Sequence, residues 1–308
     1  MKMKKSMMDN TILKQFLADF NNGYFIKVGN KTKQLFIGKD DEGRYCFEFR
    51  GKFIPVKLIG SMPLIVNQYK LNETENILRF SLEREELIGC FSSFCEDLIT
   101  SAELDDDNAV YRALSNRYQA WKKLFKPNHR TLFEYEVMGL IGELLFLQEI
   151  AFVHWGKDIA LESWTGPEKT HKDFSYKTEW YEIKCITAGK ETVHISSIEQ
   201  LDSDVAGILY IYSLEKMSPS FNGIKLNELV NSISTSLNSI QKDTFLNKLG
   251  MFGYDFSPEY NNLVYTVTDK SSYLVEADFP RIIRQNIPIA IAKVQYDLIL
   301  SDLIKYKQ

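Results

Sequence analysis

The sequence predicts an α/β protein that carries a smaller, β-rich part at its N-terminal end. Short segments with strand-like alternation fill residues 24–83 and are separated by turn residues. From residue 86 onward, helical stripes of apolar residues alternate with apolar strand segments, which is the pattern of a sheet covered by helices. We therefore expect a β-rich domain over residues 1–83 and a larger α/β domain over residues 84–308.

Composition and charge narrow the class of protein. The chain has 308 residues, with 37 Lys and Arg, 41 Asp and Glu, and a net charge of −4. Its 44% hydrophobic and 25% charged residues are ordinary globular values, which excludes a largely disordered chain. A charge this close to zero excludes a wholly basic protein that coats nucleic acid, but it leaves room for a local basic groove.

The distribution of apolar residues indicates the cellular location of the protein. No apolar run approaches the ~18 residues that a membrane span requires. The basic N-terminus is followed by Asp9-Asn10-Thr11 instead of the apolar core of a signal peptide. We therefore expect a cytoplasmic protein with no membrane contact.

The cysteines and histidines show no metal-binding spacing. The four cysteines lie apart, with no CxxC pair, at Cys46, Cys90, Cys95 and Cys185. We expect them to be free thiols, buried among apolar neighbours. The four histidines form neither an HExxH motif nor a Cys/His cluster, at His129, His154, His171 and His194. This argues against a zinc hydrolase.

Six short strands and then three helices are expected in the N-terminal half. The strands are expected over residues 24–28, 34–37, 44–49, 53–59, 64–69 and 77–82. The helices are expected over residues 86–102, 105–125 and 132–152. Thr131 with Glu134 fits a capping box at the start of the third helix. That helix is mostly apolar but contains Glu143, a carboxylate that is costly to bury without a partner.

Strands dominate the next segment. They are expected over residues 159–164, 172–176, 180–186 and 193–195. Ser196 with Glu199 fits a capping box that opens a short helix through about residue 202, and a buried strand follows at 205–213. Apart from the short strand at 193–195, the order from residue 132 to 213 is thus helix, three strands, helix, strand. The remaining expected elements are helices at 226–240 and 245–249 and strands at 263–267, 273–276 and 289–296.

The most informative stretch runs from Asp173 to Lys184. If Lys177-Thr178 forms the turn of a hairpin, Asp173 lies directly opposite Glu182, with about 4.5–5.5 Å between their Cβ atoms. Lys184 follows Glu182 by two residues and so shares its face. Two carboxylates that close repel each other unless a positive charge sits between them. Such oxygen ligands suit Mg²⁺ or Mn²⁺, which can polarise a phosphoryl oxygen and activate a bound water that the lysine orients. The pattern predicts phosphodiester hydrolysis.

The same three side chains also have a purely structural interpretation, namely a solvated sheet face that bears a salt bridge. An acid followed by E-x-K is common in proteins, so the spacing alone is weak. The context favours catalysis, because Glu143 precedes the hairpin on an apolar helix and a capped helix and a buried strand follow it.

The residues and their order resemble the PD-(D/E)XK nucleases, whose restriction-endonuclease-like core has the order αβββαβ. The resemblance is to one subfamily in particular, catalogued as a domain of unknown function and linked to restriction–modification and phage-defence genes. The segments that carry it are Gly142-Glu143-Leu144, Trp164-Thr165-Gly166-Pro167, His171-Lys172-Asp173-Phe174, Glu182-Ile183-Lys184 and Ile195 to Leu201, with 277–282 and 294–298 further on.

The resemblance implies roles for individual residues. Asp173 and Glu182 would be metal ligands, and Lys184 would be the catalytic lysine. Glu143 would match a helix acid that reaches the metal directly or through water. Lys172 stands where the motif is named for proline, a departure that removes no ligand.

Three further residues are candidates for binding nucleic acid. The resemblance matches Gln200 to a polar position on the helix after the core strands, where it could touch a phosphate. Ser197 lies at the expected helix N-terminus, which is a ready phosphate site. His171 shares the strand face of Asp173 if the strand extends that far. A surface glutamine, a cap residue and an edge-strand histidine are the plain alternatives for the three.

The sequence therefore predicts a Mg²⁺-dependent endonuclease that hydrolyses DNA phosphodiester bonds in restriction or phage defence, with Mn²⁺ able to substitute. The predicted catalytic residues are Asp173, Glu182, Lys184 and Glu143, of which the three acids hold the metal. Expected partners are DNA and either a second copy of the chain or other restriction or defence proteins. The alternative is a non-cleaving DNA-binding or scaffold subunit of a defence complex.

Overall fold

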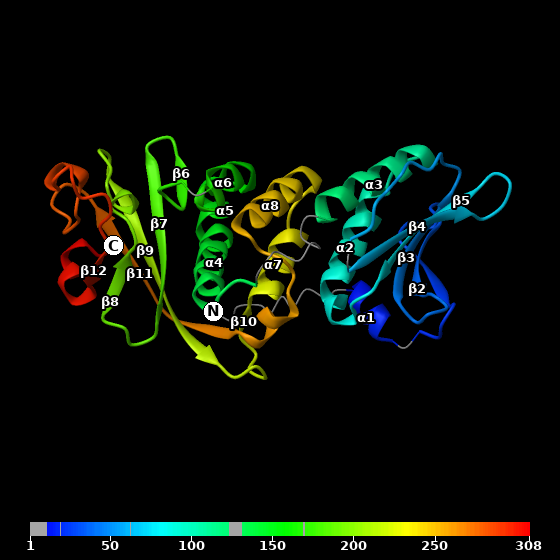
Figure 1. Cartoon of the computed structure of the whole chain (residues 1–308), viewed down its shortest axis with the longest axis horizontal. Helices are drawn as coiled ribbons and strands as arrows, with labels where there is room; N and C mark the ends of the chain where they lie inside the picture. The colour runs from blue at the N-terminus through cyan, green and yellow to red at the C-terminus, as the bar shows by residue number, and fades with distance from the viewer. Residues whose placement is uncertain (1–10, 19, 62, 123–130, 169) are drawn as a thin grey trace. The chain divides into compact units, whose positions relative to one another are not determined.

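The computed structural model is a mixed α/β protein (Figure 1). It describes residues 11–18, 20–61, 63–122, 131–168 and 170–308. The chain forms two compact units, one of residues 1–131 and 231–258 and the other of residues 132–230 and 259–308. The expected boundary after residue 83 falls within the first unit, and a division into domains at that point stays a prediction.

The first unit contains the β-rich segment. Its five-stranded antiparallel sheet has the order β1-β2-β3-β5-β4. The strands are β1 (Phe25–Val28), β2 (Leu35–Lys39), β3 (Tyr45–Gly51), β4 (Leu64–Lys70) and β5 (Asn76–Leu82), after helix α1 (Thr11–Leu17). Helices α2 (Ile88–Ser101) and α3 (Asp107–Lys122) pack on one face of this sheet, where Phe80 contacts Phe94 and Tyr118.

The predicted strand over residues 53–59 is wrong, because side chains satisfy its backbone in place of a neighbouring strand. The N–H of Ile54 donates to Asn108 Oδ1 at 3.1 Å, and that of Val56 donates to Tyr111 Oη at 2.8 Å. The predicted helix over residues 105–125 corresponds to α3. Its last three residues, including Phe125, lie outside the described residues.

A buried carboxylate explains why a C-terminal helix belongs to the first unit. Asp97 accepts hydrogen bonds from Arg117 Nε at 2.8 Å, from Trp121 Nε1 at 2.7 Å and from Lys242 Nζ at 2.9 Å. Lys242 lies on α8 (Ser239–Phe252), which begins after Asn238. Three donors satisfy a group that would be costly to bury alone.

The second unit is built around a mixed sheet of order β10-β11-β9-β7-β6, in which β7 and β9 are parallel and the other pairs antiparallel. Its strands are β6 (Phe174–Tyr176), β7 (Glu179–Thr187), β9 (Gly207–Met217), β10 (Ile224–Lys225) and β11 (Val264–Val275). Helix α4 (Glu134–Phe146) lies beside β7 (Figure 1). A separate two-stranded sheet pairs β8 (Thr192–Ile195) with β12 (Tyr296–Ile299).

Several predicted elements differ from those observed. The strand predicted over residues 159–164 is wrong, because all but its last residue belong to helix α6 (Lys157–Ser163) and a short apolar run fits either structure. Gly156, with a φ of 75°, directly precedes this helix. The predicted helix after Ser196 is only a 3₁₀ turn, Ile198–Gln200. The helix predicted over 226–240 ends earlier, as α7 (Leu226–Thr235), and 245–249 is the middle of α8. The strands predicted over 263–267 and 273–276 are the two ends of one strand, β11 (Val264–Val275). Of the strand predicted over 289–296, only Tyr296 is in a strand, as the first residue of β12.

One helix is more apolar over its length than the sequence analysis indicated. Helix α4 continues through a π-helical turn, Leu147–Ala151, into α5 (Phe152–His154). The stretch Glu134–His154 has 21 residues and is long and apolar enough to cross a membrane. A single such helix is weak evidence for a span, because buried core helices have the same length and composition. Here the helix packs on β7 and carries Glu143.

Candidate active site

The β6–β7 hairpin has the register that the sequence predicts. Phe174 pairs with Tyr181 and Tyr176 with Glu179, so the next pair outward is Asp173 with Glu182. Lys177 occupies the turn at φ 55°. Oδ2 of Asp173 accepts a 2.7 Å hydrogen bond from the N–H that follows Glu182 in the chain, which fixes this carboxylate against β7.

Glu182 and Lys184 form an ion pair at the centre of the site. Nζ of Lys184 lies 2.9 Å from Oε1 of Glu182, whose residue is 1% exposed. Apart from this ammonium, no donor among the described residues reaches either oxygen of Glu182. Burial and the nearby charge of Asp173 raise the pKa of Glu182 to about 8. Burial alone would lower the pKa of Lys184, but Glu182 and Asp173 outweigh it and raise that pKa.

Glu143 brings a third carboxylate from helix α4. Its Oε2 accepts a 2.6 Å hydrogen bond from the indole Nε1 of Trp164. Burial and the charge of Asp173 hold the pKa of Glu143 well above its ordinary value. A Cβ atom at Gly166 would lie 2.7 Å from Glu143 Oε2 and 3.2 Å from Asp173 Oδ1, so both acids border the space that this glycine leaves open.

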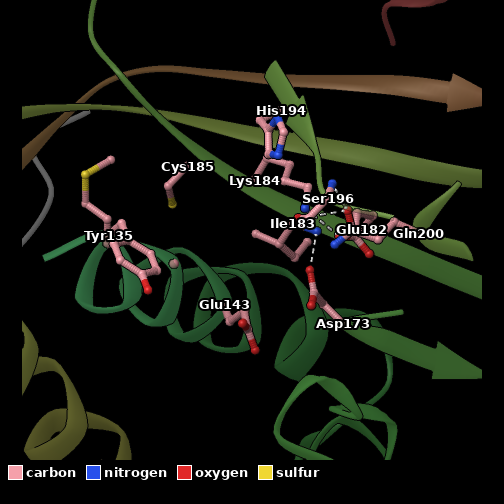
Figure 2. A pocket seen from close by; sticks show the side chains of 12 residues that line it. Tyr135, Glu143, Asp173, Glu182, Ile183, Lys184, Cys185, His194, Ser196 and Gln200 are labelled. Carbon is pink, nitrogen blue, oxygen red and sulfur yellow. Dashed lines mark hydrogen bonds and ion pairs between the residues drawn. The ribbon is translucent and has the colours of Figure 1, made fainter. Parts of the chain in front are cut away.

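These side chains line one pocket of about 340 Å³ (Figure 2). All four predicted catalytic residues are on its wall. The lining residues are Tyr135, Met138, Gly139, Glu143, Asp173, Glu182, Ile183, Lys184, Cys185, His194, Ser196 and Gln200. A pocket of this size accommodates a phosphate group with its neighbouring atoms, and the charged wall suits a polar ligand.

The donor set fits a hard divalent cation. Three buried or half-buried carboxylates line the same pocket, and neither oxygen of Glu182 has a hydrogen-bond partner beyond its ion pair. Burial raises the pKa values of all three acids, and the charge of Asp173 adds to the effect at Glu143 and Glu182. Within the part of the chain that the structure describes, however, no three acidic, histidine or cysteine side chains are already gathered as a ready-made metal cage. Ligation by Asp173, Glu182 and Glu143 therefore stays a prediction.

The turn before the hairpin holds Asp173 in place, a role that its sequence does not reveal. The backbone N–H groups of Thr165 and Gly166 both donate to the carbonyl of Asp173, at 2.8 and 3.0 Å. Trp164, at the start of the same turn, donates to Glu143. The Trp-Thr-Gly-Pro segment was the only feature of the sequence that marked this turn, and it does not indicate which groups the turn contacts.

Lys172, the residue in the position of the motif's proline, ties the hairpin to the following loop. Its Nζ donates to the carbonyls of Glu199 at 2.8 Å and Gln200 at 2.7 Å, and it lies 3.9 Å from the ring centre of Trp180. Burial lowers the pKa of Lys172 to about 8. The departure from proline thus adds a contact that positions the 3₁₀ turn next to the site.

The three candidates for nucleic-acid binding are placed differently. Gln200 lines the pocket, and its Oε1 accepts from the N–H of Ser196 at 2.8 Å. This contact replaces the predicted capping box between Ser196 and Glu199. Ser197 precedes the 3₁₀ turn and His171 is exposed, and neither lines the pocket. Their contact with nucleic acid stays a prediction.

Comparison with known proteins agrees with the geometry. Residues 29–301 match a protein family described as "Putative PD-(D/E)XK family member". The match covers most of the chain, and the chain therefore belongs to this nuclease-like family. No curated protein and no solved structure matches it.

Proposed function

We propose that this protein is a Mg²⁺-dependent endonuclease that hydrolyses DNA phosphodiester bonds. The single observation that carries the proposal is the Glu182–Lys184 ion pair, buried beside Asp173 and Glu143 in one pocket. Burying three acids around one ammonium stabilises nothing by itself, as their raised pKa values indicate. Such strain is typical of sites whose charges serve a reaction.

Each side chain has a task in this proposal. Asp173, Glu182 and Glu143 would hold the cation, which when bound polarises a phosphoryl oxygen and lowers the pKa of a bound water. Asp173 is oriented by the N–H of Ile183, and Glu143 by the indole of Trp164. The ammonium of Lys184 would orient the attacking water and offset the negative charge that develops on the phosphorus oxygens.

The biological setting is part of the proposal. We infer that the substrate is DNA and that the protein acts in the cytoplasm, in restriction or phage defence. Cutting both strands needs two active sites, which favours a second copy of the chain, and other restriction or defence proteins are the alternative partners. Support for this setting comes from the resemblance of the site segments to the subfamily linked to such genes.

A second candidate is a non-cleaving DNA-binding or scaffold subunit of a defence complex. The observation that favours it is that the described acids are not already drawn together as a three-ligand cage. A protein of this kind would show no stabilisation by Mg²⁺ that depends on Asp173.

The test is a cleavage assay on modified and unmodified phage DNA with Mg²⁺ and with Mn²⁺. We expect the parent to cut and both Asp173→Asn and Lys184→Ala to lose at least about 100-fold of the rate. Lys190→Ala, which removes an exposed lysine near the end of β7, serves as the matched control and should cut normally. Lys184→Ala should still bind DNA.

Thermal unfolding with added Mg²⁺ separates the two candidates. An endonuclease should be stabilised by Mg²⁺ in the parent and not in Asp173→Asn. A parent that binds DNA, ignores Mg²⁺ and never cuts supports the non-cleaving subunit. Normal cutting by Lys184→Ala contradicts the role given to that lysine.

A further inference from the structure

The wall of the candidate active site includes a histidine that is paired with an aspartate. His194 on β8 and Asp297 on β12 are direct cross-strand partners in the two-stranded sheet. Nδ1 of His194 lies 2.7 Å from Oδ1 of Asp297. The two residues are 103 positions apart in the chain, so only the folded protein brings them together.

The place of the pair sets it apart from an ordinary surface contact. His194 lines the pocket that also contains Glu143, Asp173, Glu182 and Lys184. In the view of Figure 2 it lies at the edge of this group, next to Lys184. Its side chain is 49% exposed, so a ligand in the pocket can reach the ring. Among the described residues, only Asp297 bonds to this ring, through Nδ1, and Nε2 is left for a ligand.

A carboxylate at one ring nitrogen prepares the other for proton transfer. It accepts the Nδ1 proton and fixes the orientation of the ring. The second nitrogen, Nε2, remains available to a ligand, and in the imidazolium form it carries a proton that it can give away. Histidine held in this manner is the commonest general acid or base in enzymes.

We propose that His194 is a catalytic residue that protonates the leaving oxygen during phosphodiester cleavage, and that Asp297 positions it. This inference rests on the proposed nuclease function. The water oxygen forms the new bond to phosphorus, and the bond from phosphorus to the leaving oxygen breaks. That oxygen takes the Nε2 proton of His194, the attacking water releases one proton to solvent, and His194 regains a proton from solvent.

The chain supplies a matched pair for comparison. His154 and Glu179 are also joined in the second unit, with Nε2 and Oε2 2.8 Å apart and side chains 51% and 47% exposed. Neither residue lines the pocket. Exposed pairs of this kind contribute little to stability. If His194→Ala loses activity and His154→Ala does not, the difference is therefore due to the position of His194 in the pocket.

The test compares leaving groups in the full-length protein. Ordinary DNA is set beside DNA with sulfur in place of the 3′ or the 5′ bridging oxygen, since a departing thiolate needs no proton. We expect His194→Ala to slow cleavage of ordinary DNA by about 100-fold or more. With the substrate whose leaving atom is sulfur, His194→Ala should cut within about threefold of the parent.

The remaining variants complete the experiment. Asp297→Asn should lose about 10-fold on ordinary DNA and little on the sulfur substrate, because it disturbs the orientation of His194 without removing it. His154→Ala should match the parent on both. Circular dichroism melting confirms that every variant folds.

Each outcome supports or overturns the role proposed for His194. Equal slowing of both substrates by His194→Ala would mean that the ring binds DNA without donating a proton, and unchanged rates on both would mean that it has no part in cleavage. Either result overturns the inference and leaves the nuclease proposal intact. A parent that cuts none of the substrates, with Mg²⁺ or Mn²⁺, overturns the nuclease proposal itself and the inference with it.

Discussion

The indole nitrogen of Trp164 donates a 2.6 Å hydrogen bond to Oε2 of Glu143, and both residues are buried. The bond joins the turn before the hairpin to the helix that precedes it by about twenty residues. It also lowers the pKa of Glu143 against the stronger, raising effect of burial. Trp164 therefore supports the ionised form of a carboxylate that its surroundings push toward the neutral form.

Replacing Trp164 by Phe keeps an aromatic ring and removes this donor. We expect a loss in the free energy of unfolding that is larger at pH 9 than at pH 6, because the unsupported carboxylate is harder to keep ionised. The hydrogen bond to a charged group is worth about 1.5–3 kcal/mol. Chemical denaturation at the two pH values measures the difference. Tyr118→Phe, which loses a bond to the neutral carbonyl of Ile59, should cost the same at both.

Gly166→Ala tests whether cleavage depends on the space that this glycine leaves beside Glu143 and Asp173. The added Cβ would lie 2.7 Å from Glu143 Oε2, so that carboxylate must move. A displacement of that size in a catalytic group lowers the rate on the order of 100-fold, and we expect this loss in DNA cleavage. The fold should survive. Gly89→Ala, on a helix with open space at the same atom, should leave cleavage unchanged; a parent-like rate for Gly166→Ala would contradict the placement of the acids.

The pKa of Glu182 predicts how stability changes with pH. Its folded value is about 8 and its ordinary value is 4.5. Between these two values the folded protein holds a proton that the unfolded chain has lost, so the free energy of unfolding falls as pH rises from about 4.5 to 8. A pKa difference of one between the folded and unfolded chain corresponds to about 1.4 kcal/mol, so the fall should reach a few kcal/mol.

Glu182→Gln removes this titration. We expect a shallower decline between pH 5 and pH 8 than in the parent, measured by chemical denaturation without divalent ions. Asp173 and Glu143, whose pKa values are also raised, keep part of the decline. Glu191→Gln, an exposed carboxylate in the loop after β7, should follow the parent curve. A decline as steep in Glu182→Gln as in the parent would count against the raised pKa.

Gly142 on α4 allows the helix to approach β7. A Cβ atom there would lie 2.2 Å from Sγ of Cys185. We expect Gly142→Ala to lower the free energy of unfolding by about 1–3 kcal/mol, the usual cost of overpacking. Adding Cys185→Ala removes the sulfur and should recover most of the loss. Gly139→Ala, one turn earlier with nothing within 4 Å, should be neutral or stabilising by about 1 kcal/mol.

Several elements were predictable from the sequence because their signals are local. Strand alternation on both sides of Lys177-Thr178 fixes the hairpin register, since a slip of one residue would expose every apolar side chain of the strands. The apolar stripe of α4 and the buried strand β9 were recognised for the same reason. The short run at 159–164 was assigned wrongly because a few apolar residues in succession suit a helix and a strand equally well.

The sequence alone determined the α/β elements and the placing of the acids and lysine on the hairpin, because periodicity and spacing are properties of neighbouring residues. Its motif segments indicated the family by resemblance. Only the tertiary structure decided that Trp164 and Gly166 border Glu143, that Lys172 holds the following loop, and that His194 meets Asp297 beside the same pocket. These contacts join segments up to about a hundred residues apart, and no local pattern encodes which side chains meet when the chain closes on itself.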